Sequence, residues 1–257
     1  MDLGIAGRVA VVAASTGGLG RAVGAALAAE GARVVVSGRR GDLAKQIAAG
    51  LPDAIGVEAD LTTPQGPRQL ADAALAAFGQ VDILVLNGPG PRPAAATEVT
   101  DADLAAAVDT LLLTQQRLIT GLLPGMRQRR WGRILAIGSS GVAAPLPGLA
   151  LSNAGRAALA AYLKTLATEV ASEGVTANLL LPGRIATERV AQLDAARAAR
   201  EQRTVAEVEA ASRASIPMGR YGSPAEFGAV AAFLCSAGAA YITGTAVRCD
   251  GGLVPTL

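Results

Sequence analysis

Short apolar runs alternate along the chain with longer stretches rich in alanine and leucine. The short runs have the length and β-branched content of strands, and the longer stretches have the length of helices. Repeated strand-helix-strand units predict an α/β fold with a doubly wound parallel sheet of about seven strands and helices on both faces. We expect strands at 8–15, 32–38, 54–60, 81–87, 133–139, 175–181 and 245–250.

The helices that the pattern predicts cover much of the remaining chain, and no internal repeat or long linker divides it. A single domain spanning 1–257 is therefore expected. The stretch 184–222 interrupts the alternation with two charged helical segments that end in SIPMGRYGSP, and we interpret it as a helical substrate lid. The other helices are expected at 18–30, 64–78, 101–129, 152–172 and 223–236.

Composition removes several classes of function. The net charge is +2 with no cluster of Lys and Arg, which gives no reason to expect nucleic-acid binding. The chain contains no histidine, the commonest general base and zinc ligand, so we expect no metal site. Cys235 and Cys249 are interpreted as reduced, structural thiols.

Because no apolar run approaches about 18 residues and no signal peptide is recognisable, we expect a cytoplasmic protein without a membrane span.

The segment AASTGGLGRAVG, residues 13–24, follows the first predicted strand and opens the first predicted helix. Glycines at such a position let the backbone approach a pyrophosphate, which then meets free N–H groups and the positive end of the helix. The alternative is a tight strand-to-helix turn without a ligand. On the first interpretation, the cofactor-binding residues of this turn are Ser15, Gly17, Gly18, Leu19 and Gly20.

The end of the second predicted strand indicates which dinucleotide would bind. A protein that selects NAD carries an acidic residue there for the ribose 2′-hydroxyl, whereas this chain has Gly38 followed by Arg39 and Arg40. Two arginines suit a 2′-phosphate, so NADP(H) is favoured over NAD(H). The alternative is that both arginines are only the solvated start of a helix.

Several further motifs stand in a familiar order: ASTGGLG, then LNGPG after the fourth predicted strand, GSS after the fifth, PGRIAT after the sixth, and YITG with CDGG near the end. With them the chain resembles the short-chain dehydrogenase/reductase family over nearly its whole length, most of all its 3-oxoacyl-carrier-protein-reductase branch. The resemblance implies a Rossmann-like fold. It also implies further cofactor contacts, to adenine, adenosine ribose and nicotinamide in turn, from Asp60, Leu61, Asn87, Gly88, Pro182, Gly183, Ile185 and Thr187. For Asp60 and Thr187 the alternative is that they cap a helix or a turn.

The chain departs from the family pattern at the phosphate turn and at the active site. The usual Thr-Gly pair that opens the turn is Ala13 and Ala14, so a backbone with positive φ at Ala14 would be strained. In the active-site tetrad only the serine, Ser139, is kept. The asparagine position falls on Leu111, the tyrosine position on Ser152 and the lysine position on Arg156. Tyr162 and Lys164 do not restore the pair, because residues two apart do not share a helix face.

These replacements remove the proton donor. A lysine lowers the pKa of the family's tyrosine from about 10, but a serine hydroxyl is far less acidic and an arginine does not release its proton near neutral pH. Ser139, Ser152 and Arg156 are therefore the candidate catalytic residues only in the sense of binding a substrate oxygen, and Arg156 also the cofactor ribose. The alternative is that Ser152 and Arg156 merely pack or form a surface pair on a helix.

Three hypotheses of function follow. The first is an NADP(H)-dependent oxidoreductase for a carbonyl or alcohol substrate, with the proton supplied by water, by the substrate or by another residue. The second is a cofactor- or ligand-binding pseudoenzyme without redox turnover. The third is a non-redox enzyme, a dehydratase or isomerase, on the same scaffold. The sequence does not separate the first from the third.

The sequence also bears on assembly. The segments 157–167 and 111–123 are apolar nearly all round, and such a helix needs two buried sides. We expect one side to face a second subunit, giving a homodimer or, with the last strand, the homotetramer that the resemblance implies.

Four arginines bear on the substrate, which we expect to be a small molecule or an acyl group on a carrier. Arg92, Arg156, Arg184 and Arg189 would face the nicotinamide end, which predicts an anionic substrate such as a carboxylate or an acyl thioester on phosphopantetheine. The alternative is that these arginines form salt bridges with acidic residues of the lid.

Overall fold

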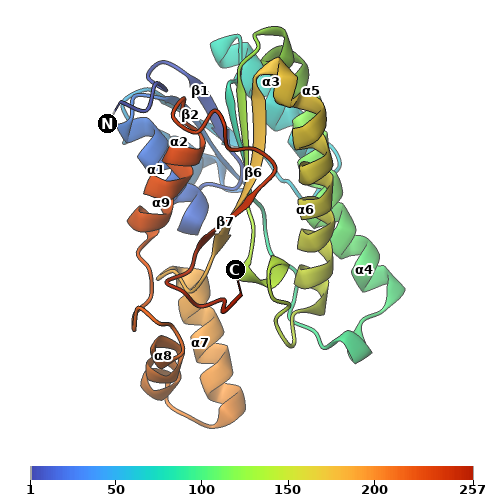
Figure 1. Ribbon diagram of the computed structural model, residues 1–257, viewed down its shortest axis with the longest axis vertical. Helices are drawn as coiled ribbons and strands as arrows, with labels where there is room; N and C mark the ends of the chain where they lie inside the picture. The colour runs from blue at the N-terminus through green and yellow to red at the C-terminus, as the bar shows by residue number, and fades with distance from the viewer. Residues whose placement is uncertain (1, 257) are drawn as a thin grey trace.

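A computed structural model describes residues 2–256 (Figure 1). Within this range one seven-stranded parallel sheet has the order β3-β2-β1-β4-β5-β6-β7, which confirms the predicted doubly wound α/β fold. The order reverses between β1 and β4, where a crevice forms at the carboxyl ends of the strands. The strands are β1 Val9–Val12, β2 Arg33–Gly38, β3 Ala54–Glu58, β4 Ile83–Leu86, β5 Gly132–Ile137, β6 Val175–Pro182 and β7 Ala246–Cys249.

Successive residues of each strand point to opposite faces, and each face has its own apolar core. In β1, Val9 and Val11 join one buried cluster while Ala10 and Val12 join the other. The first cluster packs under α3 (Gly66–Phe78), α5 (Thr114–Gln128) and α6 (Ala150–Val170). The second packs under α1 (Gly18–Ala29), α2 (Gly41–Ala49) and α9 (Pro224–Leu234), on the other side of the sheet in Figure 1.

The helices differ from the expected pattern in two places. The nine-residue helix α2 was not predicted; it packs so closely on β3 that a Cβ at Gly56 would lie 2.2 Å from the backbone nitrogen of Lys45. The long helix expected at 101–129 is interrupted by a π-helical turn, Asp109–Leu113, which separates α4 (Asp101–Val108) from α5. Such π turns occur often at functional sites. Short 3₁₀ turns lie at Ala96–Glu98, Ser140–Val142 and Ala171–Glu173.

Outside the sheet, the segment 184–222 forms α7 (Glu188–Glu201) and α8 (Val205–Ala214), which project together at one end of the molecule (Figure 1). Asp194 of α7 is fully buried, forms an ion pair with Arg184 and accepts a hydrogen bond of 2.8 Å from the hydroxyl of Tyr221. Arg184 follows β6 and Tyr221 precedes α9, so this one carboxylate ties α7 to both ends of the segment. No helix in residues 2–256 is long and apolar enough to span a membrane.

Candidate active site

The loops after β1, β2, β3 and β4 enclose a cavity of about 280 Å³ at the carboxyl edge of the sheet. Because the carboxyl ends of parallel strands meet at one edge, residues far apart in sequence share this cavity. Residues that the sequence did not single out also line it, among them Thr16. The predicted cofactor-binding residues that line it are Gly17, Arg39, Arg40, Asp60, Leu61, Asn87 and Gly88.

The phosphate turn holds Ala14 in the left-handed conformation that favours glycine, with φ +47°. The predicted strain is therefore present. Two side chains hold this backbone in place: the Ala14 N–H donates to the Ser37 hydroxyl (3.1 Å), and the Asn87 amide donates to the Ala14 carbonyl (3.1 Å). Surrounding contacts of this kind are what allow a strained residue to persist.

The glycines of the turn serve two different purposes. A Cβ at Gly20 would lie 2.7 Å from the Ala14 carbonyl oxygen and 2.8 Å from the Asn87 amide nitrogen, so the packing of the protein requires glycine there. A Cβ at Gly17 or Gly18 would meet no atom of the described chain within 4 Å. The first turn of α1 has no acidic residue, and its cap at Gly17 makes no side-chain hydrogen bond. The free N–H groups and the open space fit a bound pyrophosphate.

Two of the predicted turn residues direct their side chains into the fold. Ser15 is 1% exposed, and its hydroxyl donates to the Val12 carbonyl (2.7 Å) and accepts from the Ser37 N–H (2.9 Å). Leu19 packs against the buried cluster beneath α1. The sequence analysis did not identify Ser37. The only indication of its role was that it is a polar residue near the end of an otherwise apolar strand.

The rim of the cavity is basic. Arg39 and Arg40 are exposed there, beside Asp60. The pKa of Asp60 is lowered, mainly by hydrogen bonds from the Thr62 N–H (3.0 Å) and hydroxyl (2.7 Å), and to a smaller extent by the charge of Arg39. The side chain of Asp60 therefore caps a turn, as the alternative interpretation predicts. Asp60 also lines the cavity, which agrees with the cofactor-binding interpretation.

At the other end of the site, Arg156 points from α6 toward the end of β5. Its Nη1 donates to the carbonyls of Ile137 (2.9 Å) and Gly138 (3.2 Å), and its Nε donates to the Ser152 hydroxyl (3.3 Å). No carboxylate of residues 2–256 forms an ion pair with it. Burial lowers the pKa of Arg156, but an arginine still stays charged at neutral pH. The two residues do form a pair, at the end of a buried strand and not on an exposed helix surface.

Ser139 and Leu111 complete this end of the site. The Ser139 hydroxyl accepts from the Gly141 N–H (3.1 Å) and so caps the 3₁₀ turn Ser140–Val142. Leu111 lies in the π turn, is 4% exposed and packs against Gly155, where a Cβ would lie 2.7 Å from the Leu111 Cδ1. An apolar side chain thus occupies the position at which the family pattern has an amide.

Sequence reasoning also missed Asn153. Its side-chain amide accepts from the Leu146 N–H (3.3 Å) and donates to the Leu146 carbonyl (2.9 Å), which fastens the loop after β5 to α6. Its signal was available, since it is a polar residue directly after Ser152 in a mostly apolar helix.

The described chain has three tyrosines that could replace the phenol expected at position 152, namely Tyr162, Tyr221 and Tyr241. Burial, and to a lesser extent Glu169, raise the pKa of Tyr162, which is the wrong direction for an acid that works near neutral pH. The Tyr221 hydroxyl bonds to Asp194, and Tyr241 is fully exposed. Lys164 lies against Gly244, beside the loop before β7.

Of the four arginines expected to face the substrate, two are neutralised. Arg92 forms a two-pronged ion pair with Asp103 of α4 (2.8 and 3.2 Å), and this hydrogen bonding lowers the pKa of Asp103 to about 2. Arg184 pairs with Asp194 of α7, as the salt-bridge alternative predicts. Arg189 is exposed. Only Arg156 remains as a partly buried, unpaired cation.

The predicted cofactor-binding residues after β6 make contacts within the fold. Pro182 ends β6, Gly183 packs on Asp250, and Ile185 is buried. Thr187 caps α7 by accepting from the Val190 N–H (3.4 Å), so the capping alternative is realised for its hydroxyl.

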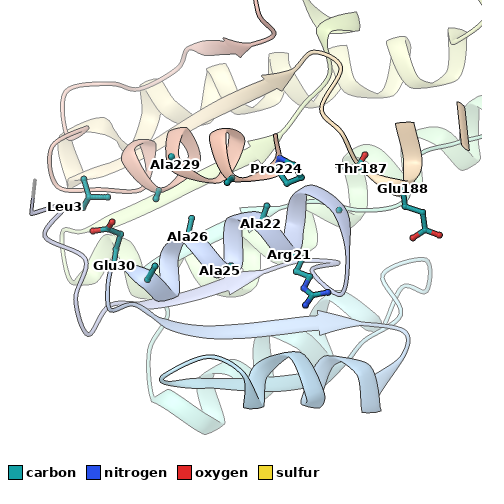
Figure 2. Close-up of a pocket in the computed structure, with 14 residues that line it drawn as sticks. Leu3, Arg21, Ala22, Ala25, Ala26, Glu30, Thr187, Glu188, Pro224 and Ala229 are labelled. Carbon is teal, nitrogen blue, oxygen red and sulfur yellow. The ribbon is translucent and has the colours of Figure 1, made fainter. Parts of the chain in front are cut away.

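Thr187 and Gly18 line one end of a larger groove of about 680 Å³ between α1 and α9 (Figure 2). These two predicted residues therefore share one groove. The rest of the groove is lined mainly by alanines and includes none of Ser139, Ser152 and Arg156, so we assign no chemistry to it.

Comparison with known proteins places these features in context. The sequence profile described as enoyl-(acyl carrier protein) reductase matches residues 13–254. The chain is 34% identical over 252 residues to the 3-oxoacyl-[acyl-carrier-protein] reductase FabG of Vibrio cholerae, covering 98% of this chain and 99% of that one. It is also 34% identical over 248 residues to the Escherichia coli enzyme of the same name, covering 96% and 97%.

Solved structures give the same relationship. An L-sorbose reductase from Gluconobacter frateurii, complexed with NADPH and L-sorbose, superposes with a TM-score of 0.94 at 32% identity, covering all of both chains. YwfH, an NADPH-dependent reductase involved in bacilysin biosynthesis, superposes with a TM-score of 0.92 at 27% identity, covering 98% of this chain and all of that one.

Proposed function

The chain belongs to the short-chain dehydrogenase/reductase family of oxidoreductases, and on that premise we propose that it binds NADP(H) and acts on a carbonyl or alcohol substrate through an altered tetrad. Ser139, Ser152 and Arg156 bind the substrate oxygen in this proposal. The observation that supports it most is the charged, unpaired Arg156 at the end of β5.

The cofactor part of the proposal rests on the glycine turn and the basic rim. Backbone N–H groups at the start of α1 would hold the pyrophosphate, and Arg39 and Arg40 would hold a 2′-phosphate. When bound, NADPH supplies a hydride. Both NADPH-related reductases in the structural comparison are consistent with this choice.

The chain's own groups can orient and polarise the substrate oxygen but cannot protonate it quickly. Arg156 and the hydroxyls of Ser139 and Ser152 are hydrogen-bond donors, and none has a pKa near neutral. The proton therefore comes from water or from the substrate. A missing general acid slows such a reaction on the order of 10²- to 10⁴-fold, so ordinary ketones are poor substrates in this proposal.

A second candidate is binding of cofactor or ligand without turnover. Leu111 favours it, because its packing on Gly155 leaves no amide where the usual tetrad has one. A non-redox reaction in the same pocket, a dehydration or isomerisation, is the third possibility that the test must separate.

We further propose that the substrate is a small molecule or a carrier-bound acyl group, since the relatives named above reduce a 3-oxoacyl carrier protein or L-sorbose. Of the four arginines, the partly buried Arg156 and the exposed Arg189 are without an ion pair in the described chain, and the proposed anionic substrate depends on them. For assembly we propose a homodimer through α5 and α6, or a tetramer that adds β7. Exposed Leu104 and Leu113 lie beside that helix pair. Light scattering that shows a monomer at micromolar concentration would contradict the proposed dimer and tetramer.

The test is a fluorescence titration with NADPH and NADH, followed by a turnover screen with and without NADPH. Tight NADPH binding with cofactor oxidation supports the proposal. Binding without any turnover supports the second candidate, and product formation without cofactor consumption supports the third. Absence of NADPH binding would overturn the proposal.

A further inference from the structure

The guanidinium of Arg156 is a partly buried cation without a counter-ion. An unpaired buried charge is costly, and the carbonyls of Ile137 and Gly138 offset only part of that cost. Nη2 makes no hydrogen bond to any described residue, and it is absent from the fully buried unpaired atoms, so it borders accessible space. Two N–H donors of a fixed cation therefore face that space.

Two hydroxyl groups belong to residues next to this cation: Ser152 contacts the Arg156 Nε, and Ser139 follows Gly138, whose carbonyl accepts from the Arg156 Nη1. The Ser152 oxygen accepts from the Arg156 Nε–H, and the Ser139 oxygen accepts from the Gly141 N–H. Neither hydroxyl donates to a residue of the described chain, so both hydrogens can turn toward a ligand. A Cβ at Gly141 would lie 3.3 Å from the Ser139 hydroxyl and 2.5 Å from the side chain of Asn153, which places Ser139 against the first turns of α6.

The surroundings strengthen the field of the cation. Leu111 packs on Gly155, the residue before Arg156, and burial lowers the pKa of Arg156 with no contribution from an acidic side chain. Hydrogen bonds to a charged oxygen are stronger in such an environment than in water. Because the donors are held before a ligand arrives, little reorganisation accompanies binding.

We propose that Arg156, Ser152 and Ser139 form a site for a preformed, delocalised oxyanion, such as an enolate or a phenolate. A tyrosine-lysine pair delivers a proton to an oxygen, whereas a fixed guanidinium keeps that oxygen negative. The substrate class that fits is an acidic enol or phenol, for example a 1,3-dicarbonyl compound. This proposal rests on the proposed function only in placing the substrate oxygen at Arg156.

The test uses 4-nitrophenol, whose anion and neutral form differ in absorption, and needs no cofactor. The probe is titrated with pH in the presence and absence of the full chain. We expect the pKa of the bound probe to fall by about one unit or more, which is a preference of about tenfold for the anion. Arg156→Met should abolish the shift, and Ser152→Ala combined with Ser139→Ala should reduce it.

Two controls keep the result interpretable. Arg156→Lys retains the charge without the planar fork and should keep part of the shift, and it serves where Arg156→Met does not fold. Arg200→Met removes an exposed arginine of α7 and should change nothing. Circular dichroism checks the fold of each variant.

A wild-type chain that leaves the probe pKa unchanged, or that gives no spectral change at the highest protein concentration, overturns the inference. A shift that survives in folded Arg156→Met overturns it as well. An unchanged probe pKa together with intact NADPH binding overturns this inference and leaves the proposed function standing. A probe shift together with no NADPH binding overturns the proposed function and leaves this inference standing.

Discussion

The two ends of the candidate site, the adenosine end and the nicotinamide end of the proposed cofactor position, differ in the chemical groups that they present. At the proposed adenosine end, cofactor binding would depend on backbone N–H groups, glycines and open space around the turn after β1. At the proposed nicotinamide end, the chemistry would depend on side chains, and the resemblance puts Ser152, Arg156 and Leu111 at three of the four tetrad positions of the family pattern. A cofactor-binding scaffold can thus be kept while the proton chemistry is changed.

The physical reason is that the two ends tolerate substitution differently. The turn accepts Ala14 with φ +47° because its N–H and carbonyl are both held by hydrogen bonds, and α1 still begins at Gly18. Proton transfer instead requires one side chain with a pKa near the working pH, and a serine does not provide it. On the proposed assignment, the serine at position 152 therefore removes a proton donor that no backbone contact restores.

The largest expected effect comes from restoring the missing acid. Ser152→Tyr combined with Arg156→Lys should raise NADPH-dependent reduction of simple ketones and β-keto esters by about tenfold or more, within the 10² to 10⁴ typical of general acid catalysis. Each single replacement should do much less, because the phenol needs the lysine's charge to reach a useful pKa. Steady-state cofactor oxidation measures the gain.

Leu111→Asn should increase the gain of the double variant by returning a hydrogen-bonding group to the π turn. Rapid turnover of ordinary ketones by the wild-type chain would contradict the comparison between the two ends, since a second acid would then be present. A folded, NADPH-binding double variant without any gain would show that the pocket is not shaped for these substrates.

Most of the fold was predictable from the sequence because the strands are short apolar runs that alternate with longer helical stretches. The nine-residue α2 was missed because only Ala44 and Ala48 are buried along its body, a weak pattern beside glycines at both ends. The break at Asp109–Leu113 was missed because a π turn keeps an uninterrupted helical composition.

For the site, sequence order alone located the cavity residues, since strand ends of a parallel sheet converge. It did not reveal what each side chain contacts. The Ser15 hydroxyl points into the fold and donates to the Val12 carbonyl. Arg92 forms an ion pair with Asp103, and Arg184 forms one with Asp194. Each ion pair joins a loop residue to a helix. Partners of this kind depend on tertiary packing, which periodicity does not encode.

The next largest effect separates the two kinds of glycine at the adenosine end. Gly20→Ala should lower the free energy of unfolding by about 1 to 3 kcal/mol, because its Cβ would clash with the Ala14 carbonyl. Gly17→Ala should leave stability nearly unchanged, since its Cβ meets no atom of the described chain, yet weaken NADPH binding where the pyrophosphate passes. Denaturant unfolding and fluorescence titration measure the two effects. Equal NADPH affinity in folded Gly17→Ala would argue against the phosphate assignment.

A smaller effect tests the basic rim. Arg39→Ala should remove most of an expected tenfold preference for NADPH over NADH, about 1.4 kcal/mol, by deleting a planar donor fork for the 2′-phosphate. NADH affinity should hardly change. Arg68→Ala, which removes an exposed arginine of α3 that does not line the cavity, is the matched control. If the variant keeps the preference, the assignment of the loop after β2 is wrong.

The smallest expected effect concerns Ala14 itself. Ala14→Gly removes a left-handed conformation that costs an alanine about 1 kcal/mol, but it also adds freedom to the unfolded chain, so the net gain in stability should be at most about 1 kcal/mol, or roughly 2 to 4 °C in Tm. NADPH affinity should stay within about threefold, because the backbone already has the conformation that glycine would adopt. Gln202→Gly, at another left-handed residue with φ +52° after α7, should give a similar gain in Tm with no effect on the cofactor. A large rise in affinity for Ala14→Gly alone would mean that the adenosine end, like the nicotinamide end, has been altered.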